Sequence, residues 1–136
     1  MVQINVEYQG ELHCEAIHGP SSSVLVTDAP VDNNGKGEAF SPTDLVATAL
    51  ASCMATIMGM RADQLGVDLK GMKIVIEKEM SADLPRRIIR LAVVLDVPVA
   101  AESPHCAALI QAADHCPVKH SIHSDIAVDM QWNWLG

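Results

Sequence analysis

The side chains best suited to chemistry in this chain are cysteines, and Cys53 is the first candidate. It lies in the run Ala51-Ser52-Cys53-Met54-Ala55, where every neighbour is small or apolar. Such surroundings are typical of a buried thiol, because cysteine is among the most buried residue types. From these residues alone, an inert structural thiol and a reactive one both stay open.

Cys116 is the second candidate, because Pro117 follows it directly. Proline at the first position of a helix would make Cys116 the N-cap residue. Free amide donors and the helix dipole there stabilise a thiolate and lower its pKa. His115, Lys119 and His120 could add positive charge. The alternative is a cysteine at a helix break with no chemical role.

Metal binding competes for the same part of the chain. The zinc-type ligands there are Cys106, His115, Cys116, His120 and His123. Their spacing matches no structural zinc pattern, and no CxxC pair occurs, so we expect no metal. Cys14 and Cys106 are interpreted as core residues.

Other catalytic patterns are weak. The segment Gly35-Lys36-Gly37-Glu38 lacks the strand-loop-helix context of a phosphate-binding loop, and no Ser-His-Asp arrangement emerges. We therefore expect no cofactor. Asp44 follows Ser41 at the spacing of a capping box, so local reasoning favours a capping role for this carboxylate.

Composition predicts a single domain, 1–136, of 14.6 kDa. The net charge of −8 disfavours nucleic acid and anionic membrane surfaces as partners. The apolar run Leu45–Met60 is shorter than the ~20 residues that span a bilayer. Four cysteines without a leader segment favour a reducing compartment, and we expect a cytoplasmic protein.

The elements that must position the thiols follow from periodicity. Alternation of apolar and polar residues predicts a half-buried strand from Val2 to Tyr8, a hairpin partner at Leu12–Ala16, and a third strand at Ser22–Thr27. The polar segment Ala29–Phe40 is predicted to be a loop.

A long helix is predicted next, with Ser41 as N-cap, Pro42 at its first position, and Gly66 after its end near residue 65. The helix is apolar nearly all round from Leu45 to Met60, so protein must cover every side of it. One small sheet covers one face only. A second helix or a second subunit must cover the rest.

The remaining pattern predicts strands at 73–80 and 87–97 and a helix from Pro104 to about His115, with Ser103 before it. A short helix resumes after Pro117, and a last strand covers 125–134. The order βββ-α-ββ-α-β indicates an α+β fold rather than a βαβ sheet.

Two segments carry a family resemblance. Ser41-Pro42-Thr43-Asp44-Leu45 followed by Ala51-Ser52-Cys53 resembles the start of the central helix in the OsmC/Ohr-like family. His115-Cys116-Pro117-Val118 resembles the second cysteine motif of that family. The resemblance extends over essentially the whole chain, including the order of its elements.

The resemblance implies an intertwined homodimer, in which antiparallel sheets wrap two central helices. It also implies peroxiredoxin-like reduction of organic hydroperoxides, as protection against oxidative stress. Cys53 would attack the peroxide, and Cys116 would resolve the resulting sulfenic acid as a disulfide. A dithiol reductant, such as a lipoylated protein, would restore both thiols. Asp44 joins Cys53 and Cys116 as a catalytic candidate.

The chain also departs from the peroxidase members of the family. They carry a glutamate ten residues before the first cysteine, where this chain has Thr43, with Asp44 one residue later. They use an N-terminal arginine, and here none precedes Arg61, about 12 Å beyond Cys53 along the helix. Lys36 is the conjectured substitute. The chain thus looks closer to other OsmC-like proteins, and the alternative function is binding of a small apolar or thiol-reactive ligand in the dimer cleft.

Overall fold

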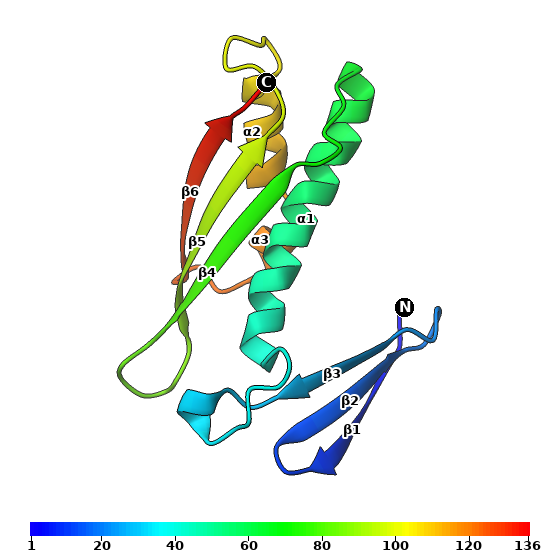
Figure 1. Cartoon of the computed structure of the whole chain (residues 1–136), viewed down its shortest axis with the longest axis vertical. Helices are drawn as coiled ribbons and strands as arrows, with labels where there is room; N and C mark the ends of the chain where they lie inside the picture. The colour runs from blue at the N-terminus through cyan, green and yellow to red at the C-terminus, as the bar shows by residue number, and fades with distance from the viewer. The chain divides into compact units, whose positions relative to one another are not determined.

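The computed structural model describes all 136 residues and contains two three-stranded sheets and three α-helices (Figure 1). The element order is βββ-α-ββ-α-α-β, which confirms the α+β class. Residue contacts divide the chain into two compact units, Met1–Val46 and Ala47–Gly136. We describe each unit by itself.

The first unit holds an antiparallel sheet in the order β1-β2-β3, which confirms the three predicted strands. Their bounds are β1 (Ile4–Gly10), β2 (His13–His18) and β3 (Val24–Asp28). The expected burial of β1 is wrong in the single chain, because Ile4 is 59% and Val6 66% exposed. The alternation that predicted the strand is real, but nothing within the first unit covers its apolar face.

The loop after β3 is compact, and backbone hydrogen bonds to Ala29 hold it together. The carbonyl of Ala29 accepts a hydrogen bond from the Gly37 amide at 3.3 Å, and its amide donates to the Leu12 carbonyl at 3.1 Å. A Cβ atom on Gly35 would lie 1.6 Å from the Ala29 carbonyl oxygen, so only glycine fits there. A short 3₁₀ turn, Val31–Asn33, lies within this loop.

Helix α1 (Pro42–Leu65) begins and ends at the predicted residues. The Asp44 amide donates to Ser41 Oγ at 3.1 Å, and the Ser41 amide donates to Asp44 Oδ2 at 2.9 Å. These reciprocal bonds are a capping box, which satisfies amides that have no partner within the helix. Gly66 ends the helix with a positive φ of 70°.

The second unit contains a sheet in the order β4-β5-β6, with β4 (Lys73–Met80), β5 (Ile88–Val97) and β6 (Ala127–Trp134). β4 and β5 are antiparallel, but β5 and β6 are parallel, so the expectation of purely antiparallel sheets is wrong. The chain returns from β5 to β6 through α2 (Cys106–Asp114) and α3 (Pro117–Ser121). A helical crossover of this kind is what parallel neighbours require.

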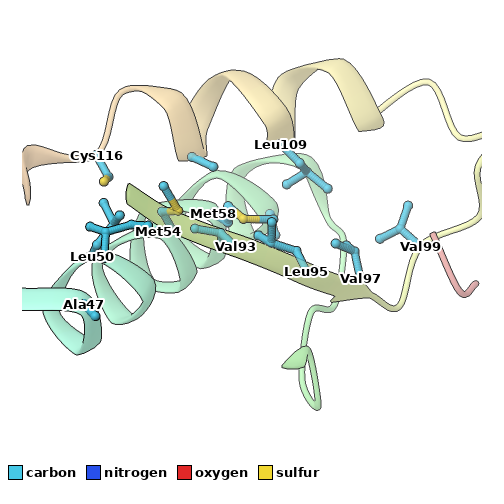
Figure 2. Close-up of a cluster of buried hydrophobic side chains, with 13 residues drawn as sticks. Ala47, Leu50, Met54, Met58, Val93, Leu95, Val97, Val99, Leu109 and Cys116 are labelled. Atoms are coloured by element: carbon cyan, nitrogen blue, oxygen red, sulfur yellow. The ribbon is translucent and has the colours of Figure 1, made fainter. Parts of the chain in front are cut away.

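The core of the second unit lies between this sheet and the helices (Figure 2). Alternate residues of β5 are buried on one face, and one stripe of α1 and the inner side of α2 pack against them. Both helices therefore cover the same face of the sheet. The buried apolar side chains are Ala47, Leu50, Met54, Met58, Ala62, Leu91, Val93, Leu95, Val97, Val99, Leu109, Ala113 and Cys116.

Helix α2 begins two residues later than predicted. Ser103 Oγ accepts a hydrogen bond from the His105 amide at 3.2 Å, and the Ser103 amide donates to the Ala100 carbonyl at 3.0 Å. The segment before Cys106 is therefore a turn. His105 is the N-cap residue and makes no capping bond with its side chain.

Helix α1 keeps a large apolar surface in the single chain. It is long and apolar enough to cross a membrane by length and composition, a test that core helices also pass. Its buried stripe packs in the core, but only 28% of its most apolar window is buried, and Met60 is 57% exposed. The predicted all-round cover of this helix is thus absent from one chain.

Candidate functional site

The structure brings Cys53 and Cys116 together within the second unit. Cys53 lies in the middle of α1, half-buried, and packs against the core. Cys116 is 0% exposed and lies at the same end of the core as Leu50 and Met54 (Figure 2). The two side chains interact directly, because Cys53 affects the titration of the Cys116 thiol through a hydrogen bond. Both cysteines are free thiols in this structure.

The position of Cys53 follows from the helical repeat of α1. Leu50 and Met54 are both fully buried on the stripe that faces the sheet. Cys53 immediately precedes Met54, so its side chain lies at the edge of that stripe. Helical geometry therefore gives this thiol one side in the core and one side open.

Cys116 is the N-cap residue of α3, as the sequence predicted. Its backbone is extended, with φ −68° and ψ 143°, and Pro117 occupies the first helical position. The Lys119 amide donates a hydrogen bond to Cys116 Sγ at 3.4 Å. The Cys116 amide in turn donates to the Ala113 carbonyl at 3.3 Å, which ties the thiol to the end of α2.

The amides at this cap lower the pKa of Cys116, as expected, but the net shift of the pKa is upward. Burial raises the pKa of the Cys116 thiol, and the neighbouring Cys53 raises it further. The amides of Lys119 and Val118 act in the opposite direction but do not outweigh the loss of water. Cys116 is consequently a protonated thiol at neutral pH, which makes it unsuited to react first with an oxidant.

The basic side chains near the thiol pair make contacts away from the two sulfurs. Lys119 Nζ lies 3.0 Å from Asp114 Oδ1, so the expected positive charge beside Cys116 is largely offset. His115 Nδ1 lies 2.8 Å from the Gln111 carbonyl oxygen, and the rings of His115 and His120 are 5.8 Å apart. The thiols therefore depend on backbone amides rather than on a side-chain cation.

The structure gives Asp44 the capping contacts described above, as local reasoning favoured. Lys36, the conjectured cation, pairs with Glu11 at 2.9 Å, and Glu11 raises the pKa of Lys36. Both residues lie in the first unit. The catalytic role of Asp44 stays a prediction.

The other candidate ligands do not assemble into a metal site. Nowhere in the chain do three His, Cys, Asp or Glu side chains converge as they would around a metal ion. Cys14 is half-buried in β2, and Cys106 Sγ donates to the Ala100 carbonyl at 3.3 Å. Cys106 packs against the core, in agreement with its predicted structural role.

Sequence reasoning missed a groove between α1 and α2, with a volume of about 350 Å³. Helix α1 lines it with Ile57, Met60, Arg61 and Gln64. Ala108, Gln111, Ala112 and His115 line the opposite side. Ile57 is one turn beyond Cys53, and His115 directly precedes Cys116, so the groove begins beside the thiol pair. The sequence shows that the α1 residues of the groove lie on one side of that helix, because they are three or four residues apart. It does not show that α2 packs opposite them.

The family assignment follows from comparison with known proteins. The family model described as OsmC-like protein matches residues 35–131. The chain belongs to the OsmC-like family. Both cysteines of the site and Asp44 lie inside the matched region.

Solved structures agree with this assignment. An osmotic stress induced and detoxification response protein from Psychrobacter arcticus 273-4 is 43% identical, with a TM-score of 0.91 over 97% of this chain and 96% of its own. An organic hydroperoxide resistance protein OsmC from Legionella pneumophila is 16% identical, with a TM-score of 0.78 and coverage of 98% and 96%.

A third structure extends the fold match to a more distant relative. An organic hydroperoxide resistance protein from Vibrio cholerae, solved with captopril in one of its active sites, is 18% identical. Its TM-score is 0.74, with coverage of 100% of this chain and 92% of its own. The two distant matches show a shared fold. The comparison with curated proteins returned no match.

Proposed function

We propose that this OsmC-like protein reduces organic hydroperoxides with Cys53 and Cys116 as its redox pair. The observation that carries the proposal is a half-exposed thiol in direct contact with a fully buried one. Fold relatives from Legionella pneumophila and Vibrio cholerae are described as organic hydroperoxide resistance proteins, which supports the same class of chemistry.

The proposed reaction has two steps before recycling. The Cys53 thiolate attacks the outer peroxide oxygen, so that an S–O bond forms, the O–O bond breaks, and the alkoxide takes a proton and leaves as an alcohol. Cys116 then gives up its proton and attacks the sulfenic sulfur, and hydroxide leaves as water while the disulfide forms. A dithiol reduces the disulfide by two exchanges and departs as a disulfide itself.

The environments of the two thiols support this division of roles. Cys53 has an open side that a peroxide can reach, whereas Cys116 is sealed in the core. Burial raises the pKa of Cys116, which favours its protonated form in the reduced protein. The Lys119 amide donates to the Cys116 sulfur and stabilises the negative charge that forms there when Cys116 loses its proton before attack.

The functional unit of this proposal is a cytoplasmic homodimer. The sheet of the first unit exposes an apolar face, and α1 exposes apolar sides, which together favour association with a second copy. The net charge of −8 disfavours a nucleic acid or an anionic membrane as partner.

Turnover of cumene hydroperoxide with dihydrolipoamide tests the proposal. We expect Cys53→Ser to lower the turnover rate by roughly 100-fold or more, because it removes the nucleophile. A factor of about this size is typical when one positioned catalytic group is removed. Cys116→Ser should reduce about one equivalent of peroxide and then stall as a sulfenic acid, which a dimedone adduct detects by mass spectrometry.

The matched control is Cys14→Ser, which removes a half-buried thiol from the other unit and should turn over like the wild type. Full turnover by Cys53→Ser would contradict the assignment of the nucleophile.

A second candidate function, binding of a small apolar ligand without turnover, is favoured by the groove between α1 and α2. An inactive wild type that binds such ligands would select it.

A further inference from the structure

We propose that α3 is a redox switch: its first turn is ordered while Cys116 is a free thiol, and it unwinds when Cys116 forms a disulfide with Cys53. This inference rests on the proposed function, because it describes how the same thiol pair is controlled during recycling. It goes beyond the reaction itself, since it assigns a change of conformation to a segment outside the pair.

The first turn of α3 depends on the sulfur of Cys116. The Lys119 amide donates to Cys116 Sγ at 3.4 Å, and the Val118 amide interacts with the same thiol. Amides in the first turn of a helix have no partner within the helix, so a capping side chain must satisfy them. The side chain that caps this turn is therefore the one that oxidation changes.

Few other contacts hold α3 in place. The helix has five residues, Pro117–Ser121, none of them fully buried, and isolated helices need about 12 residues to be stable. Val118 and Ile122 are only half-buried where they pack against the core. Lys119 Nζ pairs with Asp114 Oδ1 at 3.0 Å, but a partly exposed pair of this kind contributes little. Segments with so few buried contacts are the first to open.

Formation of the disulfide weakens the cap. The Cys116 side chain points from the start of α3 towards α1, where it meets Cys53 (Figure 2). An S–S bond of about 2 Å with a fixed dihedral angle requires the two sulfurs to move closer than any hydrogen bond brings them. The Cys116 proton leaves with the sulfenic hydroxyl as water, and the sulfur is then held by α1. A neutral disulfide sulfur is a weak acceptor for the Lys119 amide.

The switch would serve the recycling step. In the reduced protein Cys116 is 0% exposed, so neither a peroxide nor a dithiol reaches its sulfur. Thiol exchange requires direct attack on a disulfide sulfur, and its rate depends on access. Opening of α3 gives a dithiol access to the second sulfur in the oxidised state alone. Reduction restores the cap, and α3 forms again over the thiol.

Hydrogen exchange measured by mass spectrometry tests the switch. Diamide accepts the two thiol hydrogens, so it forms the disulfide without a hydroperoxide. We expect the amides of Lys119 and His120, which donate to Cys116 Sγ and to the Cys116 carbonyl, to exchange roughly fivefold faster or more after oxidation, as for loss of a helix cap. The middle of α2 should keep its protection. Equal protection of α3 in the two states would overturn the proposal.

Variants separate the cap from the disulfide. Cys116→Ser keeps a capping side chain and cannot form the disulfide, so diamide should leave α3 protected. Cys116→Ala removes the cap without oxidation and should raise exchange in α3 of the reduced protein. Cys106→Ser is the matched control, because it removes another partly buried thiol and should keep the wild-type response to diamide. Full protection of α3 in Cys116→Ala would contradict its dependence on the sulfur.

The same measurements separate failure of the switch from failure of the peroxidase. A wild type that turns over no hydroperoxide, yet loses protection in α3 under diamide, would contradict the proposed function and support the switch. An active peroxidase whose α3 stays protected after oxidation would overturn the switch alone. Absence of the Cys53–Cys116 disulfide after diamide, checked on unreduced peptides by mass spectrometry, would overturn the switch because its trigger does not form.

Discussion

Cys53 and Cys116 are neighbours in space, yet they differ in exposure and in backbone setting. Cys53 lies on a helix edge, whereas Cys116 caps a helix inside the core. The cap was predictable because Pro117 follows Cys116 directly. The direction of the pKa shift was not, since it depends on water excluded by residues distant in the sequence.

The raised pKa of Cys116 predicts how the stability of the protein changes in alkali. Above the ordinary thiol pKa of about 8.5, the unfolded state loses the proton of Cys116 while the folded state keeps it. The free energy of unfolding should therefore fall as pH rises from about 8.5 through the higher pKa of the folded state. Urea unfolding of the wild type and Cys116→Ala measures this loss.

Cys116→Ala should be less stable at pH 7 but should lose less stability between pH 8 and pH 10 than the wild type. Cys14→Ala is the control, because Cys14 lies in the other unit and should leave the steep alkaline decline in place. Parallel pH curves for the wild type and Cys116→Ala would show that Cys116 does not titrate with a raised pKa.

At the scale of elements, local signals predicted α1 well and the pairing of β6 poorly. Ser41, Pro42 and Gly66 mark the ends of α1 through bonds to nearby backbone, so its bounds were readable. The parallel partner of β6 is β5, more than 30 residues away, and alternation in β6 carries no information on direction. The same local logic misplaced the start of α2 at Pro104, because Ser103 caps a turn instead.

The capping box of α1 has a measurable value for stability. Ser41→Ala removes the oxygen that accepts the Asp44 amide in a buried position, so we expect a loss of about 1 kcal/mol in the free energy of unfolding. Ser52→Ala is the matched control on the same helix. Ser52 is exposed in its interior, where alanine is the better helix former, so stability should hold or rise slightly.

Denaturant unfolding measures both variants. A Ser41→Ala protein as stable as the wild type would show that the capping box does not contribute to the stability of α1.

Many large apolar side chains are exposed in the single chain. The face of β1 that carries Ile4, Val6 and Tyr8 is largely exposed. Parts of α1, a helix that is long and apolar enough to cross a membrane by length and composition, are exposed as well. Large exposed apolar patches mark interfaces. The homodimer proposed above would cover both surfaces with protein.

Sedimentation velocity tests that assembly. The wild type should sediment as a dimer, and Val6→Lys should shift it towards monomer, because a charge placed in an apolar interface loses its water without gaining a partner. Val75→Lys is the control, since Val75 is 59% exposed on the outer side of β4. A wild type that is monomeric at micromolar concentration would contradict the dimer, as would a Val6→Lys protein that stays dimeric.

The sequence by itself determined which segments form strands and helices, where α1 begins and ends, and that Cys116 caps a helix. These features depend on contacts within a few residues, which periodicity and capping patterns report. Only the tertiary structure decided that Cys53 meets Cys116, that burial raises the pKa of Cys116, and that α2 forms a groove with α1. Each of these depends on which distant segments the chain packs together, and on the water that this packing removes.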